Sequence, residues 1–275
     1  MQEQMIEQKS VGKIDILWIV LKAFVGFAFI RMVTSGIKIF PAPFGDAFSV
    51  AVFTYWIYQN FKKAAQKEGY TLSDCRVTKP LLTYRDILFV LGFLFLHYGI
   101  MSLGADRVIW TGQSLWDIIL VSMPEIFHSG IGSGLNEEIV FRGYLVKVLE
   151  DKIGIAKAII VSSIVFGLGH TFNGGMTLRM VIWFTIGTGI IGAMFAVITY
   201  ETGTIWRAVL THACVNLSGL IIQYETGNSL LILDFPVGAT IEQIFCTSYT
   251  VSSAVCMIVI CWYWIRRVKN RNVGV

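Results

Sequence analysis

Charged residues are scarce in this chain of 275 residues. They make up 15% of the sequence, whereas hydrophobic residues make up 55%. An ordinary soluble domain carries about 25% charged residues. The deficit, together with the long apolar runs, argues against a soluble protein. It predicts a chain that crosses a membrane several times.

The sequence also lacks the patterns that several other kinds of site require. Its five cysteines form no CxxC pair, which argues against a disulfide framework and against a metal site built from cysteine. The net charge of +4 is small, and basic residues gather at the ends of apolar runs, so we expect no nucleic-acid partner. No connection is long enough for a separate folded unit. We therefore expect a single integral membrane domain over residues 1–275.

About eight apolar segments follow one another along the chain. A helix needs roughly 20 apolar residues to cross the hydrocarbon layer. The fold class predicted is thus all-α, a polytopic membrane bundle of about eight transmembrane helices. The expected crossings are Ile14–Met32, Asp46–Phe61, Ile87–Leu103, 113–147, Ile155–His170, Leu178–Tyr200, Thr204–Tyr224 and Ile244–Ile265. Glycines in the sixth of these, Gly187, Gly189 and Gly192, allow neighbouring helices to approach closely.

Basic residues predict the orientation of this bundle. The 61–85 connection holds six Lys or Arg residues, and the 266–271 tail is also basic, so both should be cytoplasmic. The 225–243 connection is acidic and should lie outside. A multi-pass protein of the cell membrane with both termini cytoplasmic satisfies these constraints. Because 113–147 is long for one straight crossing, we expect a break at Pro124–Gly134, where a lateral or re-entrant segment would lead into a helix over Leu135–Leu149.

Two adjacent carboxylates and an arginine lie inside this apolar sequence. A charge at the centre of a membrane helix costs about 2.5–3.5 kcal/mol even on a lenient scale, so such groups must be paired, solvated or used. Glu138 and Arg142 are four residues apart and can form an ion pair on one helix face. Glu137 points elsewhere and is left as a candidate general base. The alternative is a charge network that only fixes helix packing.

Two histidines lie in later apolar runs. His170 closes the run that begins at Phe166, and alone it is typical of a helix cap or an interface. His212 and Asn216 are four residues apart on one helix face, and both side chains can donate hydrogen bonds to a developing oxyanion. Alone, this pair is equally typical of two polar groups that link helices.

Taken in order, these motifs resemble those of the CAAX-protease and bacteriocin-processing (CPBP) family of intramembrane proteases, also called Abi proteins. The family pattern is EExxxR, then FxxxH, then HxxxN on successive helices. The resemblance covers a protease core at about 115–222. The matching residues are Glu137, Glu138 and Arg142, then Phe166 and His170, then His212 and Asn216.

The resemblance implies an eight-helix bundle with a catalytic cavity inside the membrane. Glu137 and His170 would activate a water molecule for attack on a peptide carbonyl, and His212 and Asn216 would form the oxyanion hole. The reaction would be endoproteolysis of a peptide or membrane-tethered substrate, with the lipid bilayer as the surrounding partner. The supporting residues would be Glu138, Arg142 and Phe166.

A catalytic zinc ion is an alternative to this mechanism. Glu137, His170 and His212 could provide three ligands and leave one position open for water. Zinc peptidase helices often carry HExxH, with both histidines one turn apart, whereas these histidines lie on separate predicted helices. We favour the metal-free glutamate mechanism, which needs no cofactor.

Two non-proteolytic functions could use the same residues. One is a bacteriocin self-immunity or membrane assembly factor, in which the motif residues would matter only for stability. The other is a transporter, which is less favoured because the sequence contains no pair of repeated broken helices. The motifs do not specify which peptide is cleaved or whether a prenyl group is recognised.

Overall fold

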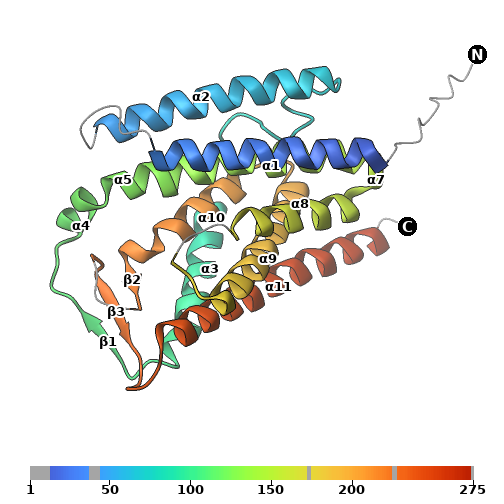
Figure 1. Cartoon of the computed structure of the whole chain (residues 1–275). Coiled ribbons are helices and arrows are strands. Elements are labelled where there is room, and N and C mark those ends of the chain that lie inside the picture. The colour runs from blue at the N-terminus through green and yellow to red at the C-terminus, as the bar shows by residue number, and fades with distance from the viewer. Residues whose placement is uncertain (1–12, 37–43, 172–174, 225–227, 274–275) are drawn as a thin grey trace, which may run out of the picture.

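The computed structural model describes residues 13–36, 44–171, 175–224 and 228–273. The first two helices, α1 (Lys13–Gly36) and α2 (Phe44–Lys67), lie side by side along one face of the molecule (Figure 1). A connection follows and ends at Thr83, which caps α3 (Tyr84–Ser102). The Thr83 backbone and hydroxyl both donate hydrogen bonds to the Asp86 carboxylate, at 2.7 Å each. This capping box fixes where α3 begins.

The helix that carries the carboxylates is bent at its start. α4 (Leu115–Val121) meets the following helix at an angle of 67°. From Met123 the chain stays helical to Ile153, as α5, η1, α6, η2 and α7, and both η segments are π-helical. The bounds are Met123–Glu125, Ile126–Ser133, Gly134–Glu138, Ile139–Leu145 and Val146–Ile153.

The expected break at Pro124–Gly134 is therefore wrong in its position. The bend lies at Ser122, and Pro124 occupies the first turn after it, where a proline needs no hydrogen-bond donor. The Gly/Ser-rich stretch Ser129–Gly134, expected to be part of this break, is helical. Gly134 has a packing reason instead, because a Cβ atom there would lie 3.1 Å from the backbone nitrogen of Ala213.

Four further helices complete the bundle. Thr177 caps α9, since its hydroxyl accepts a hydrogen bond from the Met180 backbone, and Gly203 ends it with a positive φ of 69°. α11 packs along α9, and α8 packs against α9 from another side. The bounds are α8 (Ile155–Gly169), α9 (Leu178–Thr202), α10 (Trp206–Leu217) and α11 (Ile241–Val273).

A small sheet corrects the all-α prediction. The strands are β1 (Arg107–Trp110), β2 (Ile222–Gln223) and β3 (Leu231–Asp234), and β3 lies between the other two. β1 pairs with β3 in antiparallel register and β2 pairs with it in parallel. The expected Thr204–Tyr224 helix is accordingly too long. α10 ends at Leu217, a 3-10 turn, η3 (Ser218–Leu220), follows, and the chain then enters β2.

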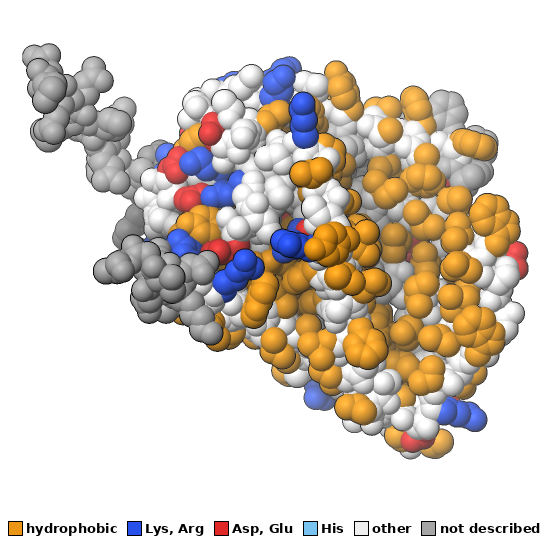
Figure 2. Space-filling view, turned by 180° about the vertical axis from the view of Figure 1, so that it is seen from behind, with side chains coloured by type: hydrophobic (Ala, Val, Ile, Leu, Met, Phe, Trp, Pro, Cys, Tyr) orange, Lys and Arg blue, Asp and Glu red, His pale blue; other side chains and the backbone are white. Residues whose placement is uncertain are grey.

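Surface and topology agree with a membrane protein. Hydrophobic side chains cover a broad band, and most charged side chains in that view gather near one end (Figure 2). The start of α1 and the end of α11 lie at one end of the bundle, with the sheet at the other (Figure 1). Among the described residues three helices are long and apolar enough to cross a membrane, or four if the bent pair forms one crossing. The count of eight crossings and the cytoplasmic termini stay predictions.

Candidate active site

A cavity of about 270 Å³ lies between the carboxylate helix and helices α8 to α11. Five of the seven residues singled out from the sequence line it, whereas Glu138 and Arg142 do not. The structure therefore brings the three motifs, which are up to 79 positions apart in the sequence, to one place. The five lining residues are Glu137, Phe166, His170, His212 and Asn216.

Glu137 and His212 face each other across this cavity. Glu137 is 1% exposed and His212 is 6% exposed. The distance from Glu137 Oε2 to His212 Nε2 is 3.8 Å. The two helices come this close because Gly134, one turn before Glu137, has no side chain to hold α6 and α10 apart. Among the described residues no group donates a hydrogen bond to Glu137 Oε2.

Glu138 accepts two hydrogen bonds through one oxygen. Arg142 Nη1 lies 3.1 Å from Glu138 Oε1, as the spacing of four residues predicts. His212 Nδ1 lies 2.8 Å from the same oxygen. Since a carboxylate can only accept, the proton in this second bond belongs to His212 Nδ1. Glu138 thus fixes the position of the His212 ring in addition to pairing with Arg142, a contact that the sequence spacing could not predict.

Aromatic rings surround the buried Arg142 guanidinium. Its central carbon lies 4.1 Å from the centre of the Phe166 ring and 5.3 Å from that of Phe195. A cation above an aromatic face is attracted by the ring, and more strongly where water is excluded. Gly192 leaves the space for this arrangement, because a Cβ atom there would lie 2.9 Å from Arg142 Nη2. Phe166 therefore supports the site through its contact with Arg142.

His170 ends α8 and faces the cavity from that side. Its Nδ1 lies 2.7 Å from the carbonyl oxygen of Phe166, so the ring is hydrogen-bonded to the last turn of its own helix. The ring also contacts Phe166 and Phe184, with centroids 4.6 and 5.6 Å apart. His170 is thus both a helix-end residue and part of the wall of the cavity.

Asn216 lies one turn beyond His212 on α10. Its side-chain nitrogen Nδ2 donates a hydrogen bond to the carbonyl oxygen of Ser129 at 2.7 Å. That bond orients the amide and leaves a second N–H for another acceptor. Together the two residues form one face of the cavity, as their spacing predicts.

Several residues of the cavity were not singled out from the sequence. One row of polar residues, spaced four positions apart, lines the cavity: Ser129, Ser133 and Glu137. Glu125 is the preceding member of this row, and its side chain is exposed. An i, i+4 series of polar residues leading to Glu137 was a signal available in the sequence. Thr188 and Tyr249 come from α9 and α11, and no sequence spacing links them to the motifs.

The described residues do not form the set of ligands that the zinc alternative requires. Among the described residues, no three His, Cys, Asp or Glu side chains converge closely enough to hold a metal ion. Glu137, His170 and His212, the alternative ligands, therefore do not converge on one metal position.

The cavity combines groups from three motifs inside a bundle of apolar helices. A mostly helical chain with membrane-type helices holds a buried carboxylate, two imidazoles and an oriented amide around one cavity. Residues 120–218 match the family described as "Type II CAAX prenyl endopeptidase Rce1-like". All three motifs lie inside this match, so the resemblance to the CAAX-protease family is confirmed over that part of the chain.

A curated relative points in the same direction. The chain is 28% identical over 130 residues to the "Putative membrane peptidase YdiL" of Bacillus subtilis (strain 168). The aligned part is 47% of this chain and 49% of the relative, so the chain spans about half the length of the relative that it matches. The family model and this relative are both described as peptidases.

Proposed function

We propose that this protein is an intramembrane endopeptidase of the CAAX-protease type, in which Glu137 activates water to hydrolyse a peptide bond. The observation that carries the proposal is the Glu137 carboxylate itself. It is 1% exposed, it faces the cavity, and its Oε2 atom accepts no hydrogen bond from the described residues. A buried carboxylate with an unused oxygen is poised to accept a proton from water.

The first step is attack of water on the substrate carbonyl. The oxygen of the water bonds to the carbonyl carbon while Glu137 accepts one proton from that water. The electron pair of the C=O double bond moves onto the carbonyl oxygen. His170 Nε2 positions the attacking water from the α8 side. Asn216 donates its second N–H to the oxyanion, and His212 Nε2 is the other donor.

The contact with Glu138 constrains how His212 takes part. Because its Nδ1 proton is directed to Glu138, His212 can donate from Nε2 only when both ring nitrogens carry protons. In that state the ring bears a positive charge between two carboxylates, which suits an oxyanion partner. The oxyanion then re-forms the carbonyl, the C–N bond breaks, and the proton held by Glu137 passes to the leaving amine. Acid and amine products complete the balance.

The proposal is tested by comparing peptide termini in membranes and medium. Cells that contain the intact protein are compared with cells that contain Glu137→Gln. Glu68→Gln is the matched control, because Glu68 is an exposed glutamate outside the cavity. We expect new termini with the intact protein and with Glu68→Gln, and none with Glu137→Gln at equal protein level. An unchanged set of termini in Glu137→Gln would refute the proposal.

A non-catalytic immunity or assembly role is the second candidate. The observation that favours it is the buried contact of Glu138 with both Arg142 and His212, which joins the carboxylate helix to α10. Such a network would hold the bundle together without any chemistry. This role predicts that Glu137→Gln leaves the cellular phenotype intact, whereas loss of the Glu138–Arg142 pair removes the folded protein.

A further inference from the structure

A second and larger hollow lies behind the candidate active site. It has a volume of about 750 Å³. Leu135 and Ile139 line it, whereas Ser133 and Glu137 line the catalytic cavity. The two pairs have the same spacing and are offset by two positions, which is about 200° around a helix. The hollow and the cavity therefore lie on opposite faces of one helix, and the hollow is not part of the active site.

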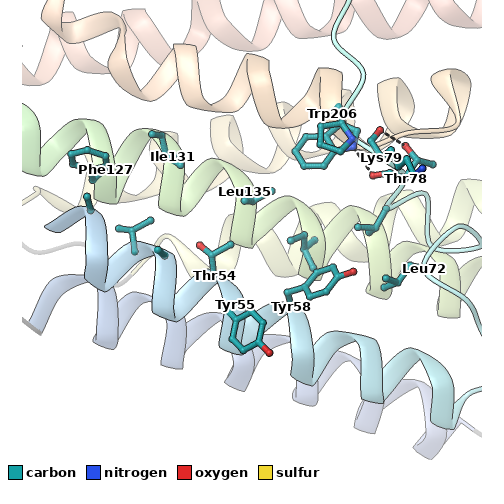
Figure 3. A pocket seen from close by; sticks show the side chains of 16 residues that line it. Thr54, Tyr55, Tyr58, Leu72, Thr78, Lys79, Phe127, Ile131, Leu135 and Trp206 are labelled. Atoms are coloured by element: carbon teal, nitrogen blue, oxygen red, sulfur yellow. Dashed lines mark hydrogen bonds between the residues drawn. The ribbon is translucent and has the colours of Figure 1, made fainter. Parts of the chain in front are cut away.

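The hollow is an apolar groove between two helices. α2 forms the wall opposite Leu135, with Thr54, Tyr55 and Tyr58 along it (Figure 3). Tyr55 is 66% exposed, so this wall borders the outer surface of the bundle. The sequence predicts a membrane crossing at Asp46–Phe61, which includes this wall, and on that prediction the surface faces lipid. The groove is therefore accessible from the bilayer rather than from the catalytic cavity.

Hydrogen bonds within the protein hold one end of the groove in place. Trp206 Nε1 donates a hydrogen bond to the carbonyl of Thr78 at 2.8 Å, and the hydroxyls of Thr78 and Thr204 are 2.8 Å apart. The backbone nitrogen of Ile205 also donates to the carbonyl of Arg76 at 3.1 Å. These three bonds hold the connection after α2 against the start of α10, so the groove ends in a fixed wall.

Lys79 supplies a positive charge at this end. It lines the groove and is exposed. Arg76, its basic neighbour, is already paired with Glu150 at 2.7 Å, whereas Lys79 takes part in none of the ion pairs between described residues. The sequence predicts that this connection is cytoplasmic. Lys79 is then at the level of the lipid headgroups, where lysine attracts anionic lipids.

We propose that the groove binds one anionic phospholipid. An acyl chain would lie along Leu135 and Ile139, with the headgroup phosphate at Lys79. A peptide is a poor occupant of the apolar part, because its backbone polar groups would find few hydrogen-bond partners there. The proposal concerns the rear face of the carboxylate helix and does not depend on proteolysis.

Trp206 provides a reporter inside the groove. The purified full chain is placed in vesicles of phosphatidylcholine that contain bromine-labelled acyl chains on either phosphatidylglycerol or phosphatidylcholine, at equal mole fraction. The signal of Trp206 is the difference between the parent and Trp206→Phe, because the chain has 8 tryptophans. We expect at least twofold stronger quenching of Trp206 by the labelled phosphatidylglycerol.

Two pairs of variants locate the site. Ala51→Phe fills the groove and should remove the preference, whereas Val52→Phe, at a neighbouring lipid-exposed position that does not line the groove, should keep it. In Lys79→Gln the two labelled lipids should quench Trp206 equally. Lys63 is an exposed lysine elsewhere in the predicted cytoplasmic connection, so Lys63→Gln should keep the preference. Equal quenching by both lipids in the parent would contradict the proposal that the bound lipid is anionic. A preference that survives both Ala51→Phe and Lys79→Gln would contradict the proposal that the groove is the binding site.

Discussion

His212 Nδ1 donates a hydrogen bond to Glu138 Oε1 across 2.8 Å, and both side chains are buried. The same oxygen accepts the bond from Arg142. The imidazole is also stacked on Phe195, with ring centroids 5.1 Å apart. The second glutamate of the motif is therefore a positioning residue for the histidine as well as a counterion for the arginine. This division is consistent with the proposed role of the first glutamate, Glu137, as the general base.

Truncation of Arg142 should destabilise the protein strongly. Arg142→Met removes the arginine partner of Glu138, whose side chain is 0% exposed, and leaves that buried carboxylate with only its hydrogen bond from His212. Breaking a buried pair in this way costs about 3–5 kcal/mol. The measurement is thermal or denaturant unfolding of the purified protein in detergent.

Lys147→Met is the matched control for that experiment. Lys147 and Asp151 form an ion pair with the same spacing of four residues, further along the same helix, and the Asp151 side chain is 41% exposed. A pair of this kind contributes under about 1 kcal/mol. Similar losses in the two variants would mean that the Arg142 pair is not buried as described.

Asn216→Ala should slow catalysis without weakening substrate binding. The amide is oriented by the Ser129 carbonyl, and its remaining N–H is proposed to serve the oxyanion. Loss of one such donor lowers kcat by about 10²–10³. Asn60→Ala is the control, because Asn60 also donates to a backbone carbonyl, that of Trp56, but lies outside the cavity. A rise in KM with unchanged kcat would contradict the role.

Most of the features that the sequence predicted correctly follow from the spacing of residues within one helix. The helices around the motifs follow from long apolar runs, and the Glu138–Arg142 pair follows from a separation of four residues. Gly192 was expected to allow close approach, and it makes room for Arg142. Each of these depends on contacts within one helix or on small side chains at a crossing.

The features that the sequence did not predict depend on contacts between distant segments. His212 and Glu138 are 74 positions apart, and nothing local indicates which carboxylate faces which ring nitrogen. The strands have only two to four residues each, too few for an alternating pattern to be distinguished from a connection. The segment after the bend at Ser122, with its π-helical turns around α6, packs on α2 and α10, and the sequence of one helix does not contain those contacts.

Proteolysis should persist after metal removal. Among the described residues, no three His, Cys, Asp or Glu side chains converge closely enough to hold a metal ion. The purified protein is treated with a strong chelator, assayed on a substrate identified from the peptide termini, and analysed for bound metal. A zinc peptidase treated in parallel shows that chelation is effective. Stoichiometric zinc whose removal abolishes turnover, with recovery on re-addition, would contradict the glutamate mechanism.

Gly167→Ala should destabilise the contact between α8 and α9. A Cβ atom at Gly167 would lie 2.5 Å from the carbonyl oxygen of Thr185, which is backbone and cannot rotate away. The helices must then separate, at a cost of about 1–3 kcal/mol. Because α8 ends at His170, the shift should also lower activity beyond the loss of folded protein. Gly92→Ala in α3, where no atom lies within 4 Å, should unfold no earlier than the parent. Equal unfolding temperatures for the parent and Gly167→Ala would show that α8 and α9 do not pack this closely.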